Sequence, residues 1–195
     1  MPQVATTLSV DEAIRDRRSV RAYAPGTLDR ATVRSLLEAA VLAPTAVHEE
    51  PWAFVVIQDR KLLQRLSDRA KPLFVAEARR ARLDRGGHAL EKFTLPEFDI
   101  FYDAGTLIVI CAKVDGPFVA ADCWLAAENL MLAAQAKGLG TCVVGSALGG
   151  LNLPEVKNEL GIPVGYTAVA PIIVGLPAGP TPATSRKAPK ILAWK

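Results

Sequence analysis

The chain has 195 residues, of which 50% are hydrophobic and 22% are charged. This balance is typical of a chain that folds around a core, so general disorder is excluded and one domain over residues 1–195 is expected. A net charge of +3 is too small to indicate a nucleic-acid partner. Charged and polar residues interrupt the longest apolar stretches, which predicts neither a membrane span nor a membrane partner. The interrupting residues are Lys113, Asp115, Glu128 and Gln135.

The N-terminus and the cysteines both predict a cytoplasmic location. The first ten residues lack the basic patch and apolar run of a secretory signal. Cys111, Cys123 and Cys142 are odd in number, widely spaced and set in apolar runs. A disulfide framework or a zinc site has a different spacing, so we expect buried, reduced thiols and no metal.

Helix and strand patterns alternate along the chain. Ser9 forms a capping box with Glu12, and Asp29 precedes a run whose apolar residues follow a 3.6-residue period. Asp59 caps a further helix, which Pro72 should interrupt. The predicted elements are helix 11–18, a helix from 29 that ends before Pro44, strand 52–58, a helix from 59, strand 105–112, helix 119–137, strand 141–144, helix 154–160 and strand 168–175. This alternation predicts an α+β fold with helices covering both faces of a mixed sheet.

Three segments have features beyond secondary structure. Residues 73–100 give the weakest pattern, and we expect a mobile excursion beside the site. The helix over 119–137 is apolar on nearly all sides, so we expect it to lie beneath the sheet and also to pack against a second subunit. The tail over 176–195 ends near Trp194, a side chain suited to anchor on a partner.

Arg17, Ser19 and Arg21 form the first candidate site. They share one side of an extended segment, and the two arginines would also share one face of a helix, so either conformation gathers two guanidinium groups. Guanidinium groups bind phosphate in a bidentate manner, which suits the anchor of a phosphorylated cofactor. The alternative is that these cations only stabilise the negative end of a helix dipole.

Two loops are further candidates. Prolines bracket the polar loop from 44 to 51, where His48 would act either as an acid or as a solvated hydrogen-bonding residue. The segment GLGTCVVGS, over 138–146, follows a helix and enters a strand, the reverse of a dinucleotide fingerprint. Its Gly145 would let a flat ring lie on the backbone. The sequence contains no Walker A or Gly-x-Ser-x-Gly pattern, which excludes nucleoside triphosphatases and common hydrolases.

Four stretches, in this order, resemble the nitroreductase family of FMN-dependent oxidoreductases. They are RRSVRAY near the start, LEAAVLAPTAVHEEPWAFVV, AAENLMLAAQAKGLGTCVVG, and PIIVGLP followed by SRK. The resemblance spans nearly the whole chain. It implies a three-layer sandwich that forms an intertwined homodimer, with one FMN in each of two sites at the subunit interface.

The resemblance assigns basic residues to the flavin and its phosphate. Arg17, Ser19 and Arg21 match the family's N-terminal flavin-binding motif, with Arg18 as an additional contact. Arg186 matches a late basic residue that meets the phosphate.

The resemblance also assigns two segments to the flavin ring. Pro44, Thr45 and Ala46 match a segment that reaches the flavin from the other subunit. Gly145 and Ser146 match a turn whose backbone amide addresses the N5 side of the flavin.

One loop departs from the family pattern. Where the family usually has an N-x-Q-P-W run, this chain has HEEPW, with His48 and Glu50 in place of two amides. An ionised carboxylate cannot donate a hydrogen bond, and it would oppose an anionic reduced flavin. We therefore expect His48 to replace the amide donor, and Glu50 to point elsewhere or to lower the flavin's reduction potential.

The resemblance implies a ping-pong oxidoreductase. NADH or NADPH would reduce the flavin and leave, and a small acceptor such as a nitroaromatic or a quinone would then take its place. No general acid is evident, so we name no catalytic side chain and expect water to supply the proton. The basic residues between 79 and 101 would favour an anionic donor. The alternatives are a flavin or deazaflavin binding module without efficient turnover, and a structural dimer with an eroded site.

Overall fold

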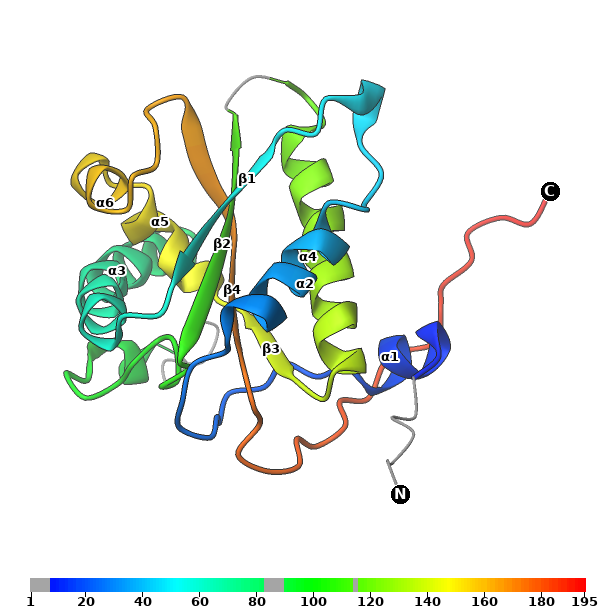
Figure 1. Cartoon of the computed structure of the whole chain (residues 1–195), viewed down its shortest axis with the longest axis horizontal. Coiled ribbons are helices and arrows are strands. Elements are labelled where there is room, and N and C mark those ends of the chain that lie inside the picture. Colours follow the sequence, from blue (N-terminus) through cyan, green and yellow to red (C-terminus); the bar gives the residue numbers. More distant parts are fainter. Residues whose placement is uncertain (1–7, 83–89, 114–115) are drawn as a thin grey trace.

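The computed structural model describes residues 8–82, 90–113 and 116–195, and these form a sandwich of helices and strands (Figure 1). Residues 83–89, part of the excursion expected beside the site, lie outside the described residues. The α-helices are α1 (Val10–Asp16), α2 (Arg30–Ala40), α3 (Arg60–Arg80), α4 (Val119–Ala136), α5 (Leu148–Leu151) and α6 (Pro154–Glu159). The 3-10 turns are η1 (Ala46–His48), η2 (Glu91–Thr94) and η3 (Gly145–Ala147). The strands are β1 (Trp52–Ile57), β2 (Thr106–Lys113), β3 (Gly140–Val143) and β4 (Tyr166–Gly175).

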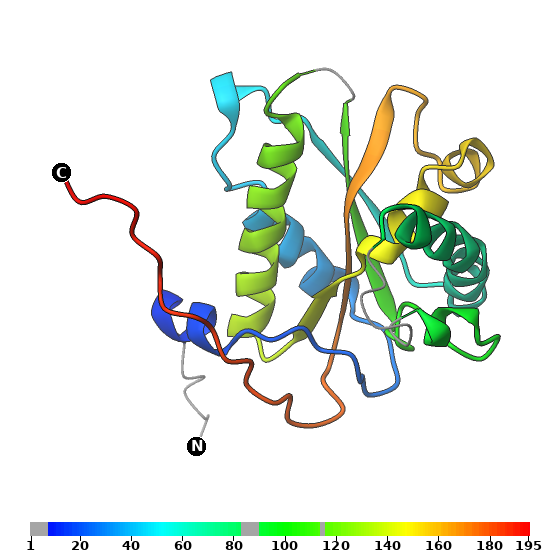
Figure 2. The same ribbon diagram turned by 180° about the vertical axis from the view of Figure 1, so that it is seen from behind.

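The four strands form one sheet in the order β1-β2-β4-β3, and each neighbouring pair is antiparallel. The sheet was expected to be mixed, but its strands are all antiparallel. Among the described residues, parallel pairing occurs only at an isolated bridge between Ser19 and Thr141. The central strands β2 and β4 are buried along most of their length, because helices cover both of their faces (Figures 1 and 2). This burial explains why their sequences are continuous apolar runs instead of alternating ones.

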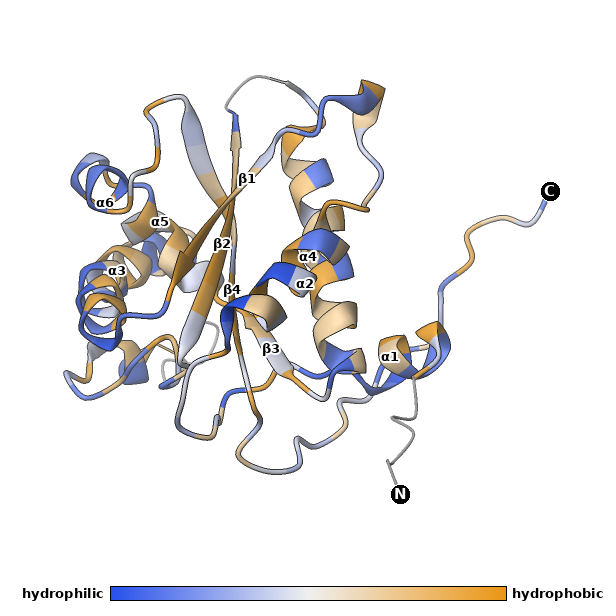
Figure 3. Cartoon of the chain, in the orientation of Figure 1, coloured by the Kyte–Doolittle hydropathy of each residue, from blue (hydrophilic) through white to orange (hydrophobic). Residues whose placement is uncertain are grey.

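Alternate residues of β2 supply two separate cores. Ile108 and Ile110 pack with α2 and α4 on one side, whereas Leu107 and Val109 pack with α3 and α5 on the other. The strands are accordingly coloured as mostly hydrophobic in Figure 3. The expected three layers are confirmed, with α2 and α4 on one face of the sheet and α3, α5 and α6 on the opposite face (Figure 2).

Local signals set the helix boundaries. The Ser9 hydroxyl accepts from the Glu12 amide while the Glu12 carboxylate accepts from the Ser9 amide, which completes the predicted capping box of α1. Asp29 and Asp59 cap α2 and α3 in the same way, each accepting from an amide three residues later. Gly138, just beyond α4, has a left-handed conformation with φ +71°, which is common for a glycine that ends a helix.

The prediction that Pro72 interrupts its helix is wrong. Helix α3 runs without a break over 21 residues, with Pro72 inside it. Proline removes one backbone hydrogen bond, but Ala70, Val75 and Ala78 are buried on both sides of it, so tertiary packing holds the helix together. The short helix α5 was not predicted, because two of its four residues are glycines.

Helix α4 has one covered face and one open face within this chain. Its inner residues, such as Ala126 and Leu130, are fully buried against the sheet and α2. On the opposite face, the residues Trp124 and Leu125 are 42% and 46% exposed. Among the described residues, no helix has both the length and the apolar character to cross a bilayer.

Candidate functional site

The segment after α1 lies along the edge of the sheet. Arg17 ends α1 with an extended backbone (φ −60°, ψ 133°), and Ser19 then bridges Thr141 of β3. The amide of Val20 donates to the carbonyl oxygen of Thr141 at 2.9 Å. Of the two conformations considered for Arg17 to Arg21, the structure adopts the extended one, as a partial strand beside β3.

Arg17, Ser19 and Arg21 all lie near enough to Cys142 on β3 to influence its thiol. Burial raises the pKa of this thiol. The positive charge of Arg21, hydrogen bonds from Ser19 and Arg21, and the charge of Arg17 all oppose that rise. Three predicted residues therefore act on one atom, and two guanidinium groups with a hydroxyl beside them form a set of donors suited to a phosphate or another anion.

Arg17 and Arg18 also have contacts with α4 and α1. Arg17 Nε also lies 3.7 Å from Glu128 Oε1 on α4, in a pair whose side chains are 23% and 48% exposed. Arg18 turns back toward α1, where its Nη1 donates to the carbonyl oxygens of Arg15 and Arg17 at 2.6 and 2.9 Å. These bonds satisfy carbonyls at the end of α1, so in this geometry Arg18 caps the helix instead of facing a cofactor.

The turn at Gly145 and Ser146 is open and has free donors. It begins two residues after β3, at the strand that the arginine segment borders. A Cβ built on Gly145 would meet nothing within 4 Å, so space lies above the backbone here. The amides of Gly145 and Ser146 make no hydrogen bond within the described parts of the chain. The turn therefore fits a planar ring that needs backbone donors, as expected for a flavin.

The loop with Pro44, Thr45 and Ala46 lies at the other end of α4. The Ala46 amide donates to the carboxylate of Asp122 at 3.2 Å, in the first turn of α4. Ser19, in contrast, pairs with the strand that follows the last turn of α4. An 18-residue helix is about 27 Å long. Figures 1 and 2 show the loop and α1 at opposite ends of α4, so one chain alone does not unite these two predicted segments.

His48 and Arg186 are both exposed within this chain. His48 lies in the same loop, with a left-handed backbone (φ +58°) that Val47 and Glu50 share. Arg186 lies in the tail that passes beside α1 and then leaves the body of the molecule (Figures 1 and 2). Neither side chain makes a hydrogen bond or ion pair with another described residue. Their expected contacts with FMN therefore stay predictions.

Two tyrosines and one aspartate beside these residues were not predicted from the sequence. The Tyr23 hydroxyl donates to the Val20 carbonyl at 2.8 Å, and its place two residues after Arg21 could have indicated that it shares that side of the segment. Tyr102 lies with its ring centroid 5.9 Å from the guanidinium carbon of Arg21, across 81 residues of sequence that give no signal of the contact. Asp122 is buried and holds the 44–48 loop, and its only signal is an acid in an apolar helix.

The three-layer fold, and a sheet edge with cationic and hydroxyl donors beside an open turn, define a protein suited to a flat cofactor with a phosphate group. The sequence model of the family described as "Nitroreductase family" matches residues 14–176. The chain therefore belongs to the nitroreductase family, whose members are oxidoreductases.

Similar proteins cover nearly the whole chain. An Archaeoglobus fulgidus protein named as an NADH dehydrogenase/NAD(P)H nitroreductase is 28% identical over 169 residues, which are 84% of this chain and 83% of that protein. The nitrobenzene nitroreductase of Ectopseudomonas oleovorans is 27% identical, and the match covers 87% of each chain. The crystal structure of a Bacteroides fragilis nitroreductase with bound FMN has a TM-score of 0.80 and 26% identity, and covers 97% of this chain and 100% of that one.

Proposed function

We propose that this chain is an FMN-dependent oxidoreductase that takes a hydride from NADH or NADPH and reduces a small acceptor, such as a nitroaromatic or a quinone, in a ping-pong reaction. The observation that carries the proposal is the gathering of Arg17, Ser19 and Arg21 at the edge of β3, the strand that leads into the open Gly145 turn. The names of the relatives support the donor and the nitroaromatic acceptor, and the FMN of the Bacteroides structure supports the cofactor.

The chain's own residues bind and orient the cofactor. Arg17, Ser19 and Arg21 would hold the phosphate and the polar edge of FMN, because they are the cationic and hydroxyl donors at this edge. The free amides of Gly145 and Ser146 would offer hydrogen bonds to the ring, and such donors stabilise negative charge that develops there. Bound FMN supplies the hydride chemistry itself.

We infer that a second copy of the chain completes each site. We call the sheet edge with Arg17, Ser19 and Arg21 the arginine edge. The loop from Pro44 to Ala46 lies at the opposite end of α4, so it would contact only the FMN held by a partner chain. The open face of α4, with Trp124 and Leu125, supports a homodimer because large apolar side chains are normally covered. A cytoplasmic location belongs to the same proposal and is supported by three buried free cysteines.

Purification with and without added FMN tests the proposal. We expect a yellow protein that NADH or NADPH bleaches under anaerobic conditions, and that a nitroaromatic or quinone then recolours. A yellow protein that neither nicotinamide bleaches would instead support the binding module. A protein that stays colourless after FMN is added would overturn the proposal.

A further inference from the structure

We propose that Lys92, together with the aromatic side chains of Phe93, Phe98 and Tyr102, forms a subsite for an electron acceptor that carries a carboxylate on an aromatic ring. The proposal rests on the proposed function and adds the chemical class of the acceptor. In it, the ammonium group of Lys92 pairs with the carboxylate, and the aromatic side chains contact the ring of the acceptor.

The aromatic side chains form a continuous cluster. The ring centroids of Phe93 and Phe98 lie 5.3 Å apart, and those of Phe98 and Tyr102 lie 5.7 Å apart, both in edge-to-face geometry. All three side chains are only partly buried, so the cluster reaches the surface. Partly exposed aromatic edges and faces are the usual contacts for an aromatic ligand ring.

Lys92 places a positive charge on this cluster. Its Nζ lies 5.3 Å from the ring centroids of Phe93 and Phe98 and 6.0 Å from that of Tyr102. These cation–π contacts fix the position of the ammonium group but leave its charge uncompensated. Within residues 8–82, 90–113 and 116–195, Lys92 forms no ion pair with a carboxylate.

The two aspartates of the same segment have other partners. The carboxylate of Asp99 accepts from the amides of Phe101 and Asp103 at 2.9 and 3.0 Å. The carboxylate of Asp103 pairs with Arg60 at 2.9 Å. Lys92 is exposed. Its ammonium group would therefore form an ion pair with a ligand carboxylate and donate hydrogen bonds to it.

The cluster adjoins the proposed cofactor site. The ring of Tyr102 makes a cation–π contact with Lys92. Its centroid also lies 5.9 Å from the guanidinium carbon of Arg21, a residue of the arginine edge. Tyr102 and Asp103 have left-handed backbones, with φ of +54° and +56°. Non-glycine residues hold this conformation only where the surrounding structure imposes it, as the Asp99 carboxylate does here.

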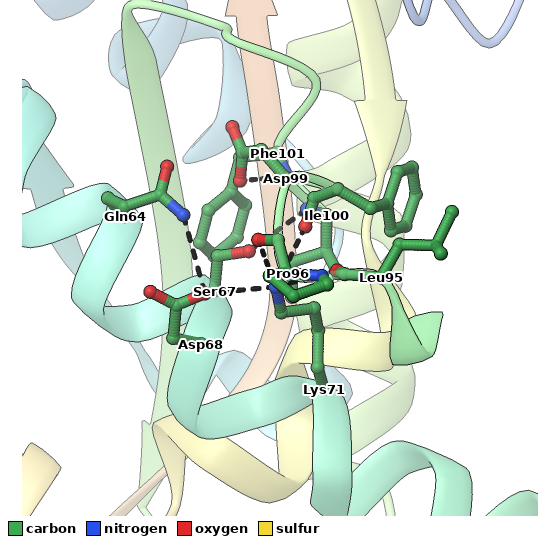
Figure 4. A network of polar contacts seen from close by, with 10 residues as sticks. Gln64, Ser67, Asp68, Lys71, Leu95, Pro96, Asp99, Ile100 and Phe101 are labelled. Carbon is green, nitrogen blue, oxygen red and sulfur yellow. Dashed lines mark hydrogen bonds and ion pairs between the residues drawn. The ribbon is translucent and has the colours of Figure 1, made fainter. Parts of the chain in front are cut away.

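A buried lysine fastens the segment that carries the cluster (Figure 4). Lys71 of α3 donates to the carbonyl oxygens of Leu95, Pro96 and Phe98 at 3.3, 3.1 and 3.0 Å, and its side chain is 8% exposed. Asp68 lies 2.9 Å from the same Nζ and balances its charge. Because the chain itself makes these contacts, they would pre-organise the subsite and lower the entropic cost of binding.

A matched pair of acceptors tests the subsite. 4-Nitrobenzoate and 4-nitrobenzamide differ in charge but have nearly the same shape. In Lys92→Gln, we expect the ratio of kcat/KM for the carboxylate to that for the amide to fall about tenfold, the effect of losing one hydrogen bond to a charged group. Lys61→Gln, which removes an exposed lysine of α3, is the control and should leave the ratio unchanged.

A binding measurement separates this subsite from the proposed function. Equilibrium dialysis of benzoate, with and without FMN, should show about tenfold weaker binding to Lys92→Gln than to the wild type, and no such change for benzamide. Equal losses for both acceptors would overturn the proposal, as would a loss confined to reduction by NADPH. If the protein failed to bind FMN, the proposed function would fall, and benzoate dialysis without FMN would still decide the subsite.

Discussion

At the scale of single residues, Glu159 shows how a partly exposed charge joins two helices. Its carboxylate oxygens lie 2.9 Å from Arg65 Nη2 and 2.6 Å from Arg69 Nη1, which ties α6 to α3. Hydrogen bonds from both guanidinium groups hold the pKa of the Glu159 carboxyl below its usual value. The ionised form is therefore favoured in the folded state, although solvent screens the attraction.

This lowered pKa predicts a stability that depends on pH. The contribution is fully present above the unfolded pKa of about 4.3, and it is lost as the pH falls through the lower folded value. We expect Glu159→Gln to lower the Tm at about pH 7 and to have a progressively smaller effect as the pH falls toward about 3. A series of thermal melts between these limits checks this. The control, Glu155→Gln, changes an exposed acid of the same helix. A Tm difference of the same size at both ends would contradict the assignment.

Short sequence patterns correctly predicted the roles of residues that interact only with atoms nearby in the chain. Ser9, Asp29 and Asp59 cap their helices as expected, because each accepts from an amide three residues later. Arg18 also lies in the predicted motif, but it bonds carbonyls of its own helix. The spacing of a motif does not determine which way a side chain turns. The contact of Tyr102 with Arg21 lay beyond sequence reasoning because it depends on how distant elements pack.

At the scale of elements, the arginine edge depends on close packing between Val20 and Gly140. A Cβ on Gly140 would lie 2.6 Å from a methyl carbon of Val20, which is buried in the fold. A side chain at this position would therefore push the segment of Arg17 to Arg21 away from β3. Because the three donors share one short segment, they would move together.

Gly140→Ala is therefore expected to weaken FMN binding as well as stability. We expect overpacking to lower the free energy of unfolding, measured in urea, by about 1–3 kcal/mol. We also expect the affinity for FMN to fall about tenfold or more, which is the effect of losing one hydrogen bond to a charged group. Fluorescence titration of FMN provides the second measurement. Gly165→Ala is the matched control, because a Cβ there would meet nothing within 4 Å. Unchanged FMN affinity in a destabilised Gly140→Ala protein would mean that the edge does not bind FMN.

Periodicity predicted most elements but not the contacts between them. The apolar runs of β2 and β4 and the capped starts of α2 and α3 were recognisable because each follows from short-range pattern. The continuity of α3 through Pro72 was not, since packing on both sides outweighs one missing hydrogen bond. The placement of the segment after η2 was also not predictable, because Lys71 contacts it through backbone carbonyls, which leave no pattern in the sequence.

At the scale of the whole molecule, α4 connects the two halves of the expected site. The arginine edge borders the strand after its C-terminal end, and the 44–48 loop is tied to its N-terminal end through Asp122. The sequence predicted that α4 must be covered all round, and the sheet and α2 cover only one side. A homodimer that packs through the open side would both cover it and bring the loop of one chain to the arginine edge of the other.

The double substitution Trp124→Glu and Leu125→Glu tests this arrangement. Burying each apolar side chain contributes about 1.5–3 kcal/mol, and a carboxylate in the same contact adds a desolvation cost. We therefore expect a monomer in sedimentation experiments that keeps its far-ultraviolet circular dichroism and loses its FMN. Val164→Glu is the control, because this 93% exposed apolar residue lies in the loop before β4, away from α4. A variant that sediments as a folded monomer and still binds FMN as tightly as the wild type would show that one chain is sufficient, and the loop at Pro44 would then have no part in the site.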